Sequence, residues 1–109
     1  IAAVVAHGTG TEANDSAEGE VLCRVFGAEG PPVVSLKGAL GHIMGAAGLL
    51  NVAAAAEIWR TGQLPPTLGS SLPHVPLRLS AAGDRVVPRR PVLALASGFG
   101  GNNVAAVIL

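Results

Sequence analysis

Residues 34–59 read VSLKGALGHIMGAAGLLNVAAAAEIW and predict a short strand, a glycine turn and a long apolar helix in direct succession. The strand covers residues 33–37, the turn covers residues 38–41, and His42 opens a helix that continues to about Arg60. This helix is apolar nearly all round and rich in small residues, which let neighbouring backbones approach closely. We therefore expect it to be sandwiched between sheets.

Lys37 and His42 flank the turn, where both side chains can point into one cleft while the helix anchors the backbone behind them. Only 13% of the residues are charged, so the placement of this pair calls for an explanation. A histidine in the first turn of a helix feels the positive end of the helix dipole, which disfavours the imidazolium and keeps the ring neutral. Lys37 and His42 are therefore candidate catalytic residues.

The composition indicates a part of a larger assembly. Half of the 109 residues are apolar and the formal net charge is zero, so the chain has too few polar residues to cover a freestanding domain of this size. A neutral chain without basic clusters argues against nucleic acid as the main partner. The apolar run at residues 43–56, interrupted by Asn51, is shorter than the roughly 18 to 20 residues that span a bilayer, so no membrane segment is expected.

The first part of the chain predicts a buried strand, a loop and a helix. Residues 1–6 are continuously apolar, which is typical of a strand covered on both faces, and the strand ends at His7. After a loop of glycines and threonines, a helix begins at Asp15 and stops at Gly27. Asp15 with Glu18 matches a capping box at the start of this helix.

The last part of the chain predicts a long loop and two paired strands. Residues 63–76 are rich in proline, glycine and serine and form an ordered surface loop, followed by a brief edge strand at residues 77–79. Residues 92–96 and 104–109 are buried strands, and the turn between them, residues 97–103, can carry a backbone-lined pocket. The order of elements predicts an α/β fold with layers on both sides of a mixed sheet.

Three short motifs stand in a fixed order along the chain. They are His7-Gly8-Thr9-Gly10-Thr11 after the first strand, Lys37-x-x-x-x-His42 at the long helix, and Gly98-Phe99-Gly100-Gly101 between the last strands. Together they strongly resemble the β-ketoacyl synthases, or ketosynthases. The resemblance covers essentially all of this chain but only the C-terminal part of such an enzyme.

The resemblance implies a thiolase-like fold, in which two similar halves form a five-layer αβαβα assembly. Residues 1–109 would supply most of the C-terminal half, a mixed sheet layered with helices. The N-terminal half, which carries the nucleophilic cysteine of the family, is absent from this chain. Cys23 falls within a predicted helix and outside any matching motif, so its ordinary interpretation is a small packed side chain.

The activity implied by the resemblance is a decarboxylative Claisen condensation. A carbanion made from malonyl on acyl carrier protein attacks an acyl group held as a thioester on the enzyme. By motif position His7 and His42 correspond to the two catalytic histidines, and Lys37 to the lysine that orders the site. Glu18 corresponds to an acidic residue near that lysine, although it could serve only as a capping-box partner.

Other motif positions imply contacts with the substrate. Thr9 and Thr11 fall where the family contacts the phosphopantetheine arm of the carrier protein, whose amides hydroxyl groups can bind. The glycine-rich turn borders the acyl pocket and helps to form the oxyanion hole of the family. The corresponding residues in this chain are Ser97, Gly98, Phe99, Gly100 and Gly101.

Two positions depart from the pattern of the family. Ser97 stands where many members carry a phenylalanine that gates the acyl pocket, so the pocket is expected to be more open. Asn51 stands where many members carry a glutamate facing the lysine, which changes the charge balance expected around Lys37. Both departures favour keeping a second hypothesis, a non-catalytic ketosynthase-like partner such as a chain-length factor. A thiolase-like degradative enzyme is a weaker third hypothesis.

The implied partners are acyl carrier protein, the missing N-terminal half and a second ketosynthase subunit, in a homodimer or a heterodimer. No bound cofactor is expected beyond the phosphopantetheine arm that carries the substrate, and the expected location is the cytoplasm. A single histidine is more often structural than catalytic, and His74, between two prolines, is read as a loop residue. The three histidines show no close metal-ligand spacing, so no metal site is expected.

Overall fold

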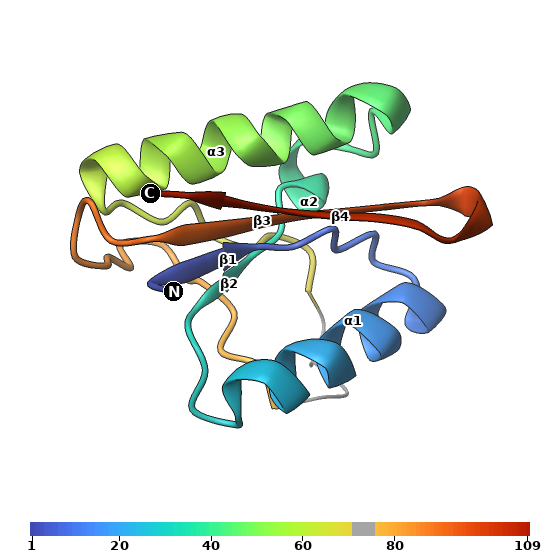
Figure 1. The fold of residues 1–109 in the computed structure, drawn as a ribbon, viewed down its shortest axis with the longest axis horizontal. Helices are drawn as coiled ribbons and strands as arrows, with labels where there is room; N and C mark the ends of the chain where they lie inside the picture. The colour runs from blue at the N-terminus through green and yellow to red at the C-terminus, as the bar shows by residue number, and fades with distance from the viewer. Residues whose placement is uncertain (71–75) are drawn as a thin grey trace.

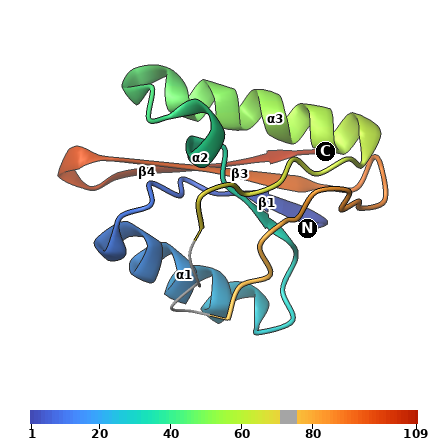
Figure 2. The same cartoon turned by 180° about the vertical axis from the view of Figure 1, so that it is seen from behind.

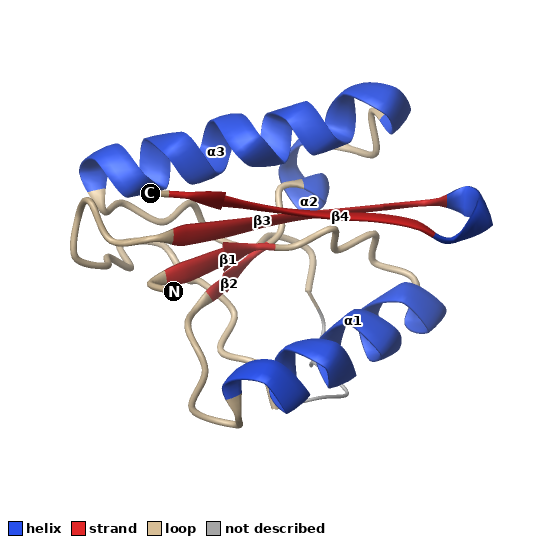
Figure 3. Cartoon of the chain, viewed as in Figure 1, coloured by secondary structure: helices blue, strands red, loops and turns tan. Residues whose placement is uncertain are grey.

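A computed structural model of the chain describes residues 1–70 and 76–109 and contains a four-stranded mixed sheet (Figure 1; Figure 3). The strand order is β2-β1-β3-β4, with β1 parallel to both of its neighbours and β4 antiparallel to β3. The strands are β1 (Ala3–Val5), β2 (Val33–Val34), β3 (Val92–Gly98) and β4 (Asn102–Ile108).

Two long helices cover opposite faces of this sheet, α1 (Glu12–Phe26) on one side and α3 (Ala47–Thr61) on the other (Figures 1 and 2). A short helix, α2 (Lys37–Leu40), follows β2. Single 3₁₀ turns cover Met44–Ala46 and Phe99–Gly101. The prediction of an α/β fold with layers on both sides of the sheet is confirmed.

The core consists of two apolar clusters, one on each face of the sheet. Successive residues of a strand point to opposite faces, so Val4 packs with Leu22 on the α1 side while Val5 packs with Ile58 on the α3 side. The side chains of Val4 and Val5 are fully buried. This explains why the first strand is continuously apolar and does not alternate with polar residues.

The long apolar helix begins later than its composition suggests. The chain leaves α2 at Gly41, whose φ is 73°, and passes through Met44, whose φ is 50°, before α3 begins at Ala47. A positive φ cannot occur within an α-helix. The prediction that His42 opens the helix is therefore wrong, and the strand expected to reach Lys37 ends at Val34, because Lys37 already belongs to α2.

Helix α1 begins three residues before the predicted position, because its N-cap is Thr11. The Thr11 hydroxyl accepts a hydrogen bond from the backbone N–H of Asn14 at 3.4 Å. Asp15 lies inside the helix and accepts from the backbone N–H of Gly10 at 3.2 Å, so the Asp15–Glu18 capping box is wrong. The predicted end at Gly27 is confirmed, since the Gly27 N–H closes the helix on the carbonyl of Cys23.

The final strands are longer than predicted, and the edge strand is shorter. Strands β3 and β4 have seven residues each and form a hairpin whose tip, Phe99–Gly101, projects beyond the rest of the sheet (Figure 1). In place of a strand at residues 77–79, Leu79 makes a single parallel bridge to Val33. No helix in the described part of the chain is long and apolar enough to cross a membrane.

Candidate active site

His7 lies two residues after the end of β1, with only 7% of its surface exposed. The carboxylate of Glu18, on α1, accepts hydrogen bonds from two successive backbone N–H groups, that of His7 at 2.7 Å and that of Gly8 at 2.8 Å. Hydrogen bonds from N–H groups to a carboxylate are stronger than those between neutral groups. Glu18 therefore holds the backbone of His7, a role that its capping-box interpretation missed.

Lys37, the first residue of α2, approaches His7 from the opposite side. Its Nζ donates to the backbone carbonyl of His7 and lies 3.5 Å from His7 Nδ1. An ammonium can only donate, so His7 Nδ1 is the acceptor of this contact and the ring proton is assigned to Nε2. Lys37 was predicted to share a cleft with His42, and its direct contact in the structure is with His7.

His42 lies in the exposed segment between α2 and the turn at Met44, with its ring next to that of His7. The ring centroids are 5.6 Å apart and the planes make an angle of 82°. His42 Nδ1 accepts a hydrogen bond from the backbone N–H of Met44 at 3.1 Å. Because Nδ1 accepts this bond, the N–H donor of the ring is assigned to Nε2. His42 precedes α3, which begins at Ala47, so it does not lie in the first turn of the long helix as the sequence suggested.

The site favours a neutral His7. Burial lowers the pKa of His7 below its usual value, and the positive charge of Lys37 lowers this pKa further, while the carboxylate of Glu18 acts in the opposite direction. Burial also lowers the pKa of Lys37, against the opposing effect of Glu18. An Nε2–H group on each of the two rings can donate a hydrogen bond to one oxygen atom that gains negative charge.

Asn51 does not face Lys37, contrary to its expected place in the charge balance. Its side chain, only 3% exposed on α3, donates to the backbone carbonyls of Ala6 at 2.9 Å and Leu95 at 2.8 Å. The carboxylate whose charge acts on Lys37 is that of Glu18. The change that asparagine at position 51 makes in the charge balance around Lys37 stays a prediction.

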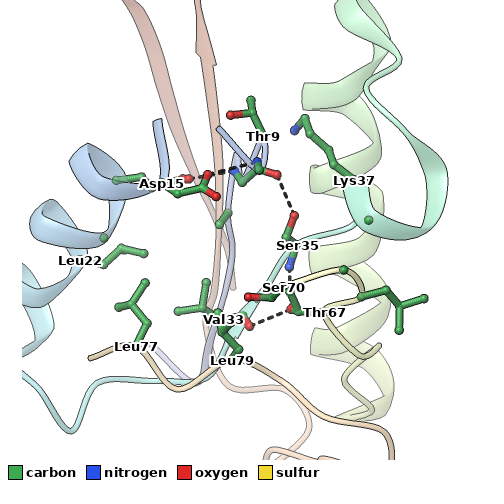
Figure 4. Close-up of a pocket in the computed structure, with 18 of the residues that line it drawn as sticks. Thr9, Asp15, Leu22, Val33, Ser35, Lys37, Thr67, Ser70, Leu77 and Leu79 are labelled. Atoms are coloured by element: carbon green, nitrogen blue, oxygen red, sulfur yellow. Dashed lines mark hydrogen bonds between the residues drawn. The ribbon is translucent and has the colours of Figure 1, made fainter. Parts of the chain in front are cut away.

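A cavity of about 410 Å³ opens beside Lys37, between α1 and the segments that flank residues 71–75 (Figure 4). Thr9 and Lys37 lie toward one end, and Leu77 and Leu79 toward the other (Figure 4). The Thr9 and Thr11 hydroxyls are 2.9 Å apart. Thr9 lines the cavity, whereas Thr11 caps α1 and is not among the residues that line it.

Two hydroxyl residues that the sequence reasoning did not single out connect the cavity to the site. Ser35 donates through its Oγ to the carbonyl of Gly8 at 2.9 Å, and its N–H donates to Thr67 Oγ1 at 3.0 Å. Thr67 also contacts the hydroxyl of Ser80 at 3.1 Å. Both hydroxyl residues are visible in the sequence, Ser35 two residues before Lys37 and Thr67 after two prolines, but the sequence does not indicate which backbone groups they bind.

The glycine-rich turn lies apart from this cavity. It forms the tip of the β3–β4 hairpin, where Phe99 is 96% exposed, and none of the residues from Ser97 to Gly101 lines the cavity beside Lys37. The described part of the chain alone therefore does not build the pocket expected at this turn. His74, read as a loop residue, lies outside the described residues.

Two further features of the described residues are independent of the histidine pair. Cys23 is half-buried on α1, with its Sγ 3.9 Å from the carbonyl of Pro76. Among residues 1–70 and 76–109, no group of three or more histidine, cysteine, aspartate or glutamate side chains is placed to hold a metal ion.

Comparison with known proteins decides the family. Residues 1–71 match the family described as "Beta-ketoacyl synthase, C-terminal domain". The chain belongs to the β-ketoacyl synthases. Its fold is thiolase-like, as predicted, and the enzymes of this family are acyltransferases that act in fatty-acid and polyketide synthesis.

Individual ketosynthases match over nearly the whole chain. It is 36% identical over 104 residues to the 3-oxoacyl-[acyl-carrier-protein] synthase 2 of Mycobacterium tuberculosis, covering 94% of this chain and 25% of that protein. It is 39% identical over 107 residues to the actinorhodin polyketide putative beta-ketoacyl synthase 1 of Streptomyces coelicolor, covering 94% of this chain and 23% of that protein. The chain thus spans about a quarter of the length of these relatives.

A solved structure, the ishigamide ketosynthase/chain length factor, superposes with a TM-score of 0.82 at 34% identity, over 98% of this chain and 27% of that chain. The ketosynthase resemblance carried by His7, Lys37 and His42 is therefore confirmed at the level of the family and the fold. The role of each site residue stays a prediction.

Proposed function

We propose that the complete protein is a β-ketoacyl-acyl carrier protein synthase that condenses malonyl-acyl carrier protein with an acyl group held on the enzyme. The observation that carries this proposal is the His7–His42 pair, with ring centroids 5.6 Å apart and both Nδ1 atoms engaged as acceptors. This arrangement leaves two Nε2–H donors for one substrate oxygen. Membership of the family supports the same reaction class.

In the proposed reaction, the bond between the malonyl carboxylate and the α-carbon breaks and carbon dioxide leaves. The electron pair of that bond moves into an enolate whose oxygen is the former thioester carbonyl oxygen. The Nε2–H groups of His7 and His42 would stabilise this oxygen, and the loss of one such donor typically lowers the rate about 10² to 10³-fold. The enolate carbon then attacks the acyl thioester, a carbon–carbon bond forms and the enzyme thiolate is released.

The nucleophilic thiolate would come from the part of the protein outside these 109 residues, as in the family resemblance. Apolar surface on this chain supports an extensive contact with that part. On the outer face of α3, Leu49 is 74% exposed and Ala53 and Ala56 are also exposed. An exposed apolar helix face of this kind indicates a further layer packed against it, as the five-layer assembly requires.

The proposal includes acyl carrier protein as the partner that delivers malonyl on its phosphopantetheine arm, a dimer of ketosynthase subunits and a location in the cytoplasm. The dimer is supported by the relative whose printed name is a ketosynthase/chain length factor. Thr9 stays a candidate contact for the arm because its side chain lines the cavity beside Lys37. The hydroxyl of Thr11 faces that of Thr9 and caps α1.

The test is a condensation assay of the complete protein with an acyl thioester and malonyl-acyl carrier protein, followed by mass spectrometry. We expect an acyl adduct on the protein and a 3-oxoacyl-acyl carrier protein product. A non-catalytic chain-length factor, which the departures at Ser97 and Asn51 keep as the second candidate, would form neither alone but would support product formation when mixed with an active ketosynthase. If the complete protein forms no adduct and no product alone, and does not support product formation when mixed with an active ketosynthase, both candidate functions are contradicted.

A further inference from the structure

The backbone around His7 is held by side chains from three different helices. Glu18 on α1 accepts from the N–H groups of His7 and Gly8. Lys37 on α2 donates to the carbonyl of His7. Asn51 on α3 donates to the carbonyl of Ala6 at 2.9 Å, which belongs to the same peptide unit as the His7 N–H. All four polar groups of the two peptide units that flank the His7 Cα are therefore bound by side chains.

We propose that Asn51 is a positioning residue that fixes the peptide before His7 and thereby sets the direction of the His7 imidazole. This inference rests on the proposed function for its kinetic consequence. The two ends of the Ala6–His7 peptide unit are bound from opposite faces of the sheet, by Asn51 from the α3 side and by Glu18 from the α1 side (Figures 1 and 2). A peptide held at both ends cannot rotate without breaking a buried hydrogen bond.

The second hydrogen bond of Asn51 ties this peptide to the neighbouring strand. Its Nδ2 also donates to the carbonyl of Leu95 at 2.8 Å. Val5 pairs with Ala94 in the parallel ladder, so the ladder between β1 and β3 ends one residue before Ala6 and Leu95. Asn51 thus continues the cross-strand connection at the point where β1 leaves the sheet and His7 begins the site.

The chemistry of the position requires a donor. Both carbonyl oxygens accept, so the residue between them must supply two N–H groups, and an uncharged carboxamide does this from a single nitrogen atom. An ionised carboxylate at position 51 would place negative charge against two carbonyl oxygens in a buried place. The asparagine therefore supplies the two N–H donors that the carbonyl oxygens of Ala6 and Leu95 need, in addition to lacking the charge of a carboxylate.

The experiment compares Asn51→Ala and Asn51→Asp with Ile58→Val in the complete protein. Aspartate has the shape of asparagine but lacks the donors. Ile58, on the same helix and 2% exposed, lies in the apolar core cluster with Val5 and Leu64, so its truncation controls for a general loss of stability. Two readouts are needed, steady-state decarboxylation of malonyl-acyl carrier protein and the ring signals of His7 in protein labelled with ¹⁵N-histidine.

We expect both Asn51 variants to change the chemical shift or linewidth of the His7 ring and to lower kcat by about 10²-fold, the effect of displacing a reacting group by about 1 Å, with KM changed much less. The Ile58→Val protein should keep the wild-type His7 signal and kcat even where its melting temperature falls as far. Asn51 variants with wild-type His7 signals and a kcat within about twofold of Ile58→Val would overturn the proposal. If wild-type protein itself releases no carbon dioxide, the proposed function fails, while the His7 signals still decide the role of Asn51.

Discussion

At the scale of single residues, burial and the charges that face His7 from two sides together set its pKa. Lys37 Nζ lies 3.5 Å from His7 Nδ1, and Glu18 binds the His7 backbone N–H at 2.7 Å. Burial is the largest cause of the lowered pKa of His7, and the charges of Lys37 and Glu18 act on it in opposite directions. The neutral ring that decarboxylation requires therefore depends on a balance that single substitutions can shift.

Opposite pKa changes are expected from Lys37→Met and Glu18→Gln. Removing the ammonium removes a positive charge that disfavours the imidazolium, so the pKa of His7 should rise. Removing the carboxylate charge should lower this pKa, because Glu18 favours the protonated ring. Titration of the ¹⁵N-histidine ring signals in the complete protein measures both. If the pKa of His7 shifts in the same direction in both variants, the charges of Lys37 and Glu18 do not act on it in opposite directions.

The residue scale also shows what sequence reasoning can and cannot supply. The motifs predicted that His7, Lys37 and His42 belong to one site, and the structure brings these residues together. Motifs can support such a prediction because they record residues that lie close together in other members of the family. The hydrogen bonds of Asn51 to the backbone carbonyls of Ala6 and Leu95 were not predicted. Every residue has a backbone carbonyl, so the sequence does not indicate which carbonyls a side chain will bind.

At the scale of elements, the apolar pattern of the sequence predicted the sheet and the two long helices, but it did not predict the path of the chain between Lys37 and α3. The apolar run that begins at Ile43 gives no sign that Met44 adopts a φ of 50° or that α3 begins only at Ala47. The boundary is set by the short helix α2, which turns the chain before α3 begins. Its position in turn depends on a close contact at Gly38.

Helix α2 can hold Lys37 in place only if residue 38 has no side chain. A Cβ on Gly38 would lie 1.8 Å from the backbone carbonyl oxygen of Leu68, so either α2 or the segment around Leu68 would have to move. We expect Gly38→Ala to cost about 1 to 3 kcal/mol of unfolding free energy, typical of overpacking, and to lower activity through Lys37. Denaturant unfolding of the complete protein measures the stability change.

Gly45→Ala is the matched control for this prediction. Gly45 lies in the 3₁₀ turn before α3, and a Cβ there would meet no atom of residues 1–70 or 76–109 within 4 Å. Its effect on stability should stay within about 0.5 kcal/mol, as for surface substitutions away from special features. Equal losses in the two variants would mean that contact with Leu68 is not what requires glycine at position 38.

At the scale of the whole molecule, large apolar side chains are exposed on both long helices and on the β3–β4 hairpin. Besides Leu49 on α3, exposed apolar side chains include Val21 and Val25 on α1, Phe99 at the hairpin tip and Val104 on β4. We expect a protein of residues 1–109 alone to self-associate, because such surface is buried in the five-layer assembly. Analytical ultracentrifugation measures this directly. A single monomeric species across a wide concentration range would contradict the expectation.

The central claim is that His7 and His42 together stabilise the enolate formed when malonyl loses its carboxylate. The most direct test is the rate of carbon dioxide release from malonyl-acyl carrier protein by the complete protein and its His42→Ala variant. If the paired Nε2–H donors act on one oxygen, the variant should release carbon dioxide about 10² to 10³-fold more slowly while the acyl adduct still forms. Undiminished release by His42→Ala would contradict the account.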